Sequence, residues 1–103
     1  VNAIVVALSQ GEVIGFASGT VLMHPDKPPL FFVNEVSVHE DFRQRGIAKR
    51  LMDRISDQAW DRGCAGIWLA TEADNVAARA LYTSSGARET GDIVVYDWGD
   101  VDI

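Results

Sequence analysis

The chain has 103 residues, enough for one domain with a modest core, and 48% hydrophobic with 23% charged residues is ordinary for a globular protein. A net charge of -6 disfavours a nucleic-acid partner, which needs a basic face, and no stretch approaches the about 20 apolar residues of a membrane span. A single cysteine, Cys64, excludes an internal disulfide and indicates a reducing cytoplasm. The acidic balance is compatible with a cationic substrate.

The first three predicted elements are strands. Residues 2–8 form a valine-rich apolar run, and residues 13–23 form a second strand after a short polar turn, so the two should pair as an antiparallel hairpin. The three prolines of the chain then mark a loop. Residues 30–38 predict a third strand, interrupted by the polar pair Asn34 and Glu35.

Two helices and a fourth strand follow. Apolar residues recurring every four positions predict an amphipathic helix over residues 46–62. Residues 67–70 are nearly all apolar, as expected of a central strand covered on both faces. A second helix, capped by Asp74 or Asn75, ends near Ser84.

A last strand over residues 93–98 completes the order β-β-β-α-β-α-β. The third strand, the first helix and the fourth strand form a strand–helix–strand unit, so these two strands should be parallel. The rest of the sheet should be antiparallel. The sequence therefore predicts a mixed α/β fold, with a mostly antiparallel sheet, one parallel strand pair and flanking helices, as one domain over residues 1–103.

Basic residues gather where the first helix begins. Five of the nine fall within twelve positions: Arg43, Arg45, Lys49, Arg50 and Arg54. A helix N-terminus presents unpaired backbone N–H groups and the positive end of the helix dipole, which together suit a phosphate. Gly46 lets the backbone approach a ligand closely. Taken alone, the loop is equally well explained as a helix start with solvated basic side chains.

Two sequence motifs resemble those of the GNAT N-acetyltransferase superfamily. The loop of residues 43–48, Arg-Gln-Arg-Gly-Ile-Ala, resembles its Gln/Arg-x-x-Gly-x-Gly/Ala signature at the matching strand-to-helix junction. Residues 75–82 followed by Ser85-Gly86-Ala87 resemble its second signature, an Asn-to-Tyr helix ending in glycine. The resemblance covers residues 1–98, and the ending from residue 87 to residue 98 is also similar to aminoglycoside 3-N-acetyltransferases.

The resemblance implies an acetyl-coenzyme A site where the third and fourth strands splay apart. Backbone groups near Val36 and Val38 would pair with the pantetheine arm, and the N–H of Val38 would polarise the acetyl carbonyl. Asn75 would bind the cofactor, and Tyr82 would protonate the leaving thiolate. The pyrophosphate would be held by the loop and helix start, namely Arg43, Gln44, Arg45, Gly46, Ile47, Ala48 and Lys49.

Two of these residues have simpler explanations as well. Tyr82 can pack its ring and expose its hydroxyl, and Asn75 is already explained as a helix cap, although it can do both. Trp60 and Trp68 are interpreted as core residues, and Cys64 as a thiol that is either buried or unreactive. No metal site is expected.

Glu35 is the candidate general base. A carboxylate in so apolar a strand is costly unless it faces a cleft, and partial burial would make it a better base toward the attacking amine. Aminoglycoside 3-N-acetyltransferases resemble this chain in carrying a carboxylate at the corresponding strand position. The alternative is an edge position that points to solvent, or a salt bridge to an arginine.

Family members normally have a strand and one or two helices before the hairpin that opens this sequence. Without that neighbour the first strand would have an unpaired edge and exposed apolar surface, which natural proteins avoid. We therefore expect either homodimerisation or residues missing from this end.

The leading hypothesis is direct transfer of an acetyl group from acetyl-coenzyme A to a primary amine of a small cationic substrate, an aminoglycoside or a polyamine. One alternative is a non-catalytic acetyl-coenzyme A-binding module or partner subunit. The other is a structural or partner-binding α/β domain in which the Gly46 loop is incidental.

Overall fold

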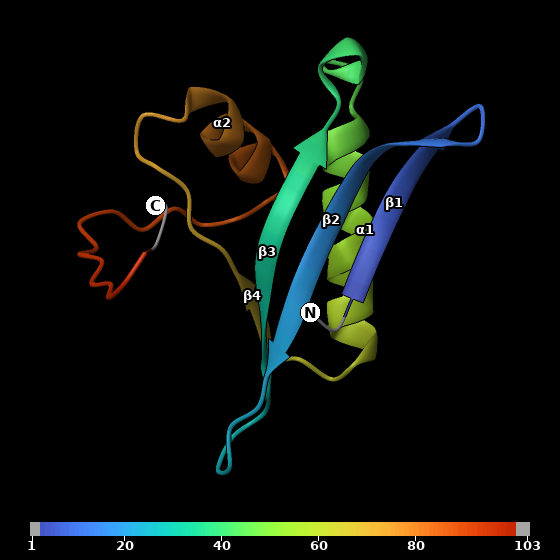
Figure 1. Ribbon diagram of the computed structural model, residues 1–103. Helices are drawn as coiled ribbons and strands as arrows, with labels where there is room; N and C mark the ends of the chain where they lie inside the picture. The colour runs from blue at the N-terminus through green and yellow to red at the C-terminus, as the bar shows by residue number, and fades with distance from the viewer. Residues whose placement is uncertain (1–2, 101–103) are drawn as a thin grey trace.

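A computed structural model describes residues 3–100. Four strands form one sheet in the order β1-β2-β3-β4, and two α-helices and one short 3-10 turn lie beside it (Figure 1). In chain order the elements are β1 (Ala3–Ser9), β2 (Glu12–Leu22), β3 (Leu30–Val38), η1 (Glu40–Phe42), α1 (Ile47–Asp61), β4 (Gly66–Trp68) and α2 (Val76–Ser84). Within the described residues, neither helix has the length and apolar character needed to cross a membrane.

The sheet is mixed, as predicted. β1 pairs with β2 and β2 with β3 in the antiparallel sense, whereas β3 and β4 are parallel. The predicted helices and the first four strands are confirmed to within a few residues at each end. The first residue of the predicted opening strand, Asn2, lies outside the described residues.

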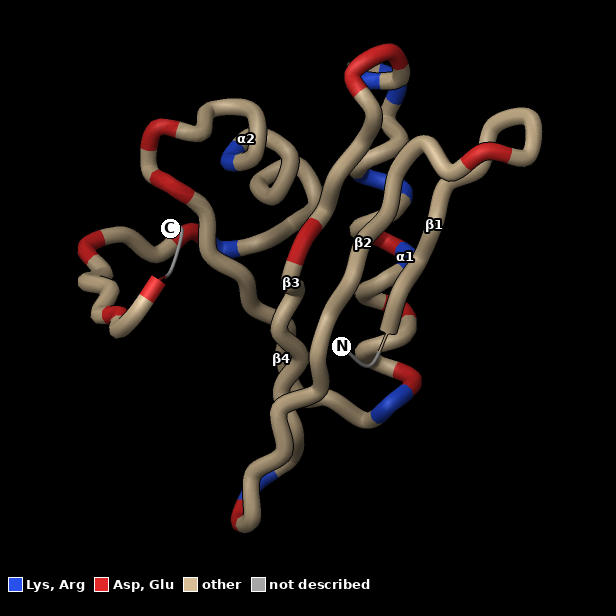
Figure 2. Tube along the Cα trace, in the orientation of Figure 1, with Lys and Arg blue, Asp and Glu red and all other residues tan. Residues whose placement is uncertain are grey.

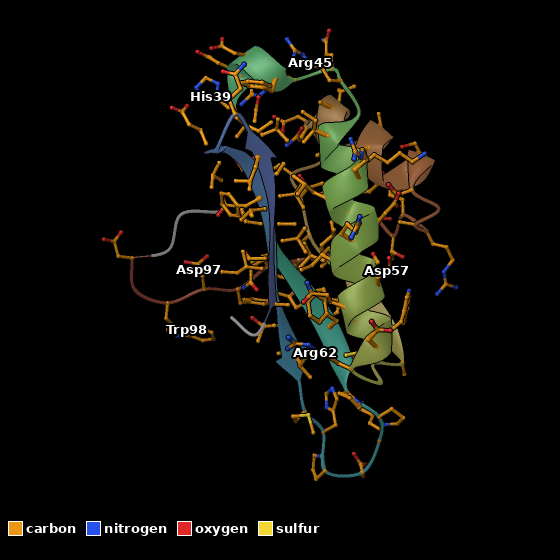
Figure 3. The ribbon with its side chains drawn as sticks, turned by 90° about the vertical axis from the view of Figure 1, so that its right-hand side faces the viewer. His39, Arg45, Asp57, Arg62, Asp97 and Trp98 are labelled. Atoms are coloured by element: carbon orange, nitrogen blue, oxygen red, sulfur yellow. The ribbon has the colours of Figure 1, made fainter. Side chains whose placement is uncertain are left out.

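The core lies between the sheet and α1, which covers one face of the sheet (Figures 1 and 3). Its buried members are Ala3, Ala17, Phe31, Val33, Leu51, Met52, Ile55, Ala59 and Cys64. The four-residue spacing along α1 therefore identified the buried stripe correctly, and Cys64 is buried as expected. Gly19 makes room for this core, because a Cβ there would lie 2.1 Å from the ring of the fully buried Phe31.

A β-bulge at Asn34 changes which way β3 directs its side chains. The register between β2 and β3 shifts here, and Asn34 is the extra residue; its Oδ1 accepts a hydrogen bond from Thr20 Oγ1 at 2.8 Å. Val33 packs in the core before the bulge and Val36 packs against it after the bulge. Glu35, between them, is therefore directed to the opposite face of the sheet.

The predicted last strand does not form. Within residues 87–98 the structure contains no strand, and the apolar side chains of Ile93, Val94, Val95 and Tyr96 are exposed. Strand-forming residues need a neighbour to accept their backbone hydrogen bonds, and this segment has none among the described residues. Figure 3 places Asp97 and Trp98 on the side of the sheet away from α1.

The interpretation of Trp60 and Trp68 as core residues is also wrong. Their exposed fractions are 52% and 49%. Trp60 is adjacent to the buried stripe of α1 but does not belong to it, since that stripe ends at Ala59. Among the described residues β4 is the last strand of the sheet rather than a central one. The Trp68 ring packs on Phe32, with the ring centroids 4.5 Å apart.

Candidate active site

β3 and β4 stop pairing halfway along β3. Their parallel register has three residue pairs and ends at Phe32 and Trp68, whereas β3 continues to Val38. Because the backbone groups of a strand point alternately to its two sides, residues 33–38 present N–H and C=O groups on the side away from β2. An extended ligand can pair with such a free strand edge. Val36 and Val38, the two residues predicted to contact the pantetheine arm, lie on this stretch.

The predicted phosphate loop joins this edge to the N-terminus of α1 (Figure 1). Gln44 and Gly46 both have left-handed backbone conformations, with φ angles of 61° and 76°. Gly46 is the N-cap of α1 and makes no side-chain capping bond. The first N–H groups of the helix, those of Ile47, Ala48 and Lys49, therefore have no intrahelical acceptor. With no acidic residue in the first turn, the positive end of the helix dipole is not compensated there.

Two arginines of the loop are held in place by neighbouring groups. Arg43 Nε donates to the carbonyl oxygen of Val38 at 3.2 Å, which ties the loop to the end of β3. The Arg45 guanidinium lies 5.1 Å from the centroid of the Phe42 ring, a cation–π distance. In both cases the contact fixes the position of the side chain, while other N–H groups of the guanidinium can still donate to an anion. Figure 2 shows basic and acidic positions close together where the chain passes from β3 to α1, and the acidic ones include Glu40 and Asp41 of η1.

α2 carries the remaining predicted cofactor residues. Asn75 is its N-cap, and Asn75 Oδ1 accepts a hydrogen bond from the backbone N–H of Ala78 at 3.0 Å. The capping explanation for Asn75 is therefore correct. It occupies only the amide oxygen, so the NH2 group of the same side chain can also donate to a ligand.

Tyr82 is half-buried and packs against the core, rather than lying free at the helix surface. Burial raises the pKa of its phenol, because the charged phenolate loses hydration. A phenol with a raised pKa keeps its proton at neutral pH, as a proton donor must.

Glu35 is exposed, which corrects the expectation that it is partly buried. The physical reason is the bulge at Asn34, which directs the carboxylate to the face of the sheet that α1 leaves uncovered. Among the described residues no arginine pairs with Glu35. The carboxylate is tolerated in an apolar strand because it stays hydrated.

The structure brings most of the candidate residues to one end of the sheet. The end of β3, the loop and the start of α1 are continuous there, and α2 lies at the same end, beyond β4 (Figure 1). Sequence reasoning missed the link from Arg43 to Val38 and an ion pair between Arg79 and Glu89. The second joins residues ten positions apart, on either side of the end of α2, so helix spacing gave no signal for it.

The proteins that resemble this chain in sequence are acetyltransferases. The sequence profile of the acetyltransferase (GNAT) family matches residues 2–87. An aminoglycoside N(6')-acetyltransferase type 1 of Salmonella typhimurium is 28% identical over 95 residues, covering 88% of this chain and 66% of that protein. A ribosomal protein bS18 alanine N-acetyltransferase of Escherichia coli K12 is 34% identical over 79 residues, covering 77% of this chain and 50% of that protein.

A solved acetyltransferase structure has a similar fold. The aminoglycoside acetyltransferase AAC(6')-Iy, bound to a bisubstrate analogue that contains CoA, superimposes with a TM-score of 0.82 at 26% identity, covering 94% of this chain and 69% of that one. The chain belongs to the GNAT acetyltransferase family. It spans about half to two thirds of the length of these curated relatives. The aminoglycoside relatives are of the 6' class, whereas the motifs had suggested the 3-N class.

Proposed function

We propose that the protein transfers an acetyl group from acetyl-coenzyme A to a primary amine of a small cationic substrate, an aminoglycoside or polyamine. The observation that carries the proposal is the continuity of a free strand edge, residues 33–38, with an uncapped helix N-terminus at Gly46. The first can pair with an extended amide-bearing arm and the second can bind its pyrophosphate. The relatives named above support the proposal because they are N-acetyltransferases.

The described residues fit acetyl-coenzyme A. The space where a side chain of Gly46 would begin is open, with no atom within 4 Å, so a phosphate can approach the backbone. The N–H groups of Ile47, Ala48 and Lys49 point along the helix axis toward that space. Arg43 and Arg45 add positive charge. When bound, the cofactor supplies the acetyl group as an activated thioester.

In the proposed mechanism the neutral amine nitrogen attacks the acetyl carbonyl carbon, so that a C–N bond forms and the C–S bond breaks. Glu35 accepts the proton that the amine loses, from the open face of the sheet. The N–H of Val38 donates to the carbonyl oxygen as negative charge develops on it. Tyr82 donates its proton to the departing sulfur, and its raised pKa keeps that proton in place beforehand.

Thiol release from acetyl-coenzyme A in the presence of a panel of amines tests this function. We expect turnover with polycationic amines, and little with neutral or acidic ones, because the protein is acidic overall. Binding of acetyl-coenzyme A, seen as a raised melting temperature, without turnover of any amine would instead support a non-catalytic binding module. Absence of both would support a structural or partner-binding domain.

We further propose that the protein acts in the cytoplasm and forms a homodimer. The dimer is supported by β1, which among the described residues has a neighbour on one edge only and exposes the apolar side chains of Ile4, Val6 and Leu8. A second copy that covers these side chains would remove them from water.

A further inference from the structure

One polar network of the structure has no part in the roles assigned so far, and it is centred on Arg79. Arg79 Nε donates to Glu89 Oε1 at 2.8 Å and its Nη2 donates to Glu89 Oε2 at 3.0 Å, so the ion pair is bidentate. The third nitrogen, Nη1, donates to the backbone carbonyl of Ala73 at 2.7 Å. A single guanidinium therefore joins the segment before α2, the helix itself and the segment after it.

α2 needs such a contact to have a defined orientation. It has nine residues and no buried side chain, and a helix of that length is not stable by itself in water. Tyr82 is the α2 residue that packs against the core. With this one apolar contact alone, α2 could rotate about its axis. The hydrogen bonds of Arg79 add a second point of attachment, three residues before Tyr82 and therefore close to it on the helix surface.

The turn after α2 explains how Glu89 reaches Arg79. Gly86 takes the left-handed conformation with φ at 92°, and the N–H of Ala87 donates to the carbonyl of Tyr82 at 3.1 Å. The chain therefore reverses about one helical turn after Tyr82, the residue that would face the thiolate. The turn that ends α2 after Ser84 therefore also delivers Glu89 to Arg79.

We propose that Arg79 is a positioning residue: held by Glu89 and by the carbonyl of Ala73, it sets the rotation of α2 and so the direction in which Tyr82 and Asn75 meet the acetyl donor. This role rests on the proposed acetyl transfer. An exposed ion pair contributes little to global stability, so its main effect is on the placement of the helix. The pair is formed at neutral pH, because the hydrogen bonds from Arg79 hold the pKa of Glu89 below its usual range.

The ionisation of Tyr82 reports directly on this placement. The chain has two tyrosines, Tyr82 and the exposed Tyr96, so a Tyr96→Phe background leaves Tyr82 as the one tyrosine. Loosening α2 hydrates the phenol and lowers its raised pKa toward the ordinary value. In that background we expect Arg79→Gln and Glu89→Gln to lower the midpoint of tyrosinate absorbance toward that of an exposed tyrosine.

Arg88→Gln is the matched control, since it removes the same charge as Arg79→Gln from the residue next to Glu89. We expect it to leave the midpoint unchanged. Arg79→Lys should behave like Arg79→Gln, because an ammonium cannot hold a bidentate carboxylate and the Ala73 carbonyl in the same geometry. An unchanged midpoint in folded Arg79→Gln and Glu89→Gln proteins overturns the proposal.

Kinetics separate positioning from a general loss of structure. We expect Arg79→Gln to lower kcat about tenfold in the wild-type background, and to add almost nothing to the loss already caused by Tyr82→Phe, because it acts through that residue. If Arg79→Gln does not fold, Glu89→Gln decides, since it keeps the bond to Ala73. If Glu89→Gln also fails to fold, the network is structural and the proposal is wrong. A shifted midpoint without turnover in the parent protein rejects the acetyl transfer and not the positioning.

Discussion

At the scale of single residues, Glu35 shows how one extra residue decides the direction of a catalytic candidate. In a strand without a bulge, residues 31, 33, 35 and 37 would share the core face, and the carboxylate would point at α1. Asn34 adds a residue, so Val36 and Val38 take the core side and Glu35 takes the open side. A base on the open face meets the amine from solvent and needs no buried channel.

Replacing Glu35 with glutamine should therefore lower kcat by about 100-fold or more, since a general base contributes 10²–10⁴-fold in typical enzymes. The affinity for acetyl-coenzyme A should stay within about twofold, because Glu35 points to the open face of the sheet and not toward the Gly46 loop that is proposed to hold the pyrophosphate. Glu12→Gln, which neutralises an exposed glutamate at the start of β2, is the control. Equal kinetics in the two variants would exclude Glu35 as the base.

Gly46 has a close counterpart in Gly63 at the other end of α1. Their φ angles are 76° and 78°, and both have open space where a Cβ would stand. Gly46→Ala and Gly63→Ala should each destabilise the fold by about 1–2 kcal/mol, because an L-residue is strained in this conformation. Only Gly46→Ala should also weaken acetyl-coenzyme A binding, as measured by calorimetry. Comparable binding by the two variants would contradict the pyrophosphate assignment.

Tyr82 should make the free energy of unfolding decrease as the pH becomes alkaline. Its pKa is raised in the folded protein, so the folded state holds the phenolic proton at pH values where the unfolded state has released it. The resulting stability is complete below the unfolded pKa of about 10 and is lost as the pH rises through the folded pKa. Urea unfolding of the Tyr82→Phe variant should lack this alkaline decline, and Tyr96→Phe, at an exposed position, should retain it.

At the scale of elements, we propose that α2 combines a structural cap and a ligand donor in the side chain of Asn75. Asn75→Ala removes the cap and should cost about 1 kcal/mol. Asn75→Asp caps equally well but has no NH2 group, so it should keep the stability of the parent protein and bind acetyl-coenzyme A more weakly. Chemical unfolding and calorimetry on the two variants distinguish the roles. If Asn75→Asp binds acetyl-coenzyme A as tightly as the parent protein, Asn75 acts only as the helix cap.

The elements that depend on local patterns could be predicted from the sequence. The four-residue spacing of Leu51, Ile55 and Ala59 depends only on helix geometry, and the structure places all three in the core. The segment of residues 93–98 has equally strong strand preferences but no strand beside it. Strand formation requires a partner, and no local pattern supplies one.

The parts of the site that depend on chain reversal could not be predicted. The candidate residues of the Gly46 loop lie in sequence order, so a motif was sufficient to find them. The Arg79–Glu89 pair requires the turn at Gly86 to return the chain to the helix, and a sequence shows the glycine but not the direction that follows it. The exposure of Trp68 likewise depends on the sheet order, which places β4 at an edge.

At the scale of the whole molecule, the two faces of the sheet differ sharply. α1 covers one face, whereas on the other face β1 exposes Ile4, Val6 and Leu8, with exposed fractions of 57%, 48% and 63%. Apolar surface of this kind on an edge strand favours association, since burying one such side chain contributes about 1.5–3 kcal/mol. The net charge of -6 is moderate and opposes self-association only weakly at physiological ionic strength.

If a second copy covers this face, a charge at its centre should separate the two copies. Val6→Lys buries an unpaired ammonium in any such contact, and light scattering should show a monomer at concentrations where the parent protein is a dimer. Met23→Lys introduces the same charge at an exposed apolar residue in the loop between β2 and β3, and should leave the dimer intact. A monomeric parent protein, or dissociation by both substitutions alike, would rule out this face as the dimer contact.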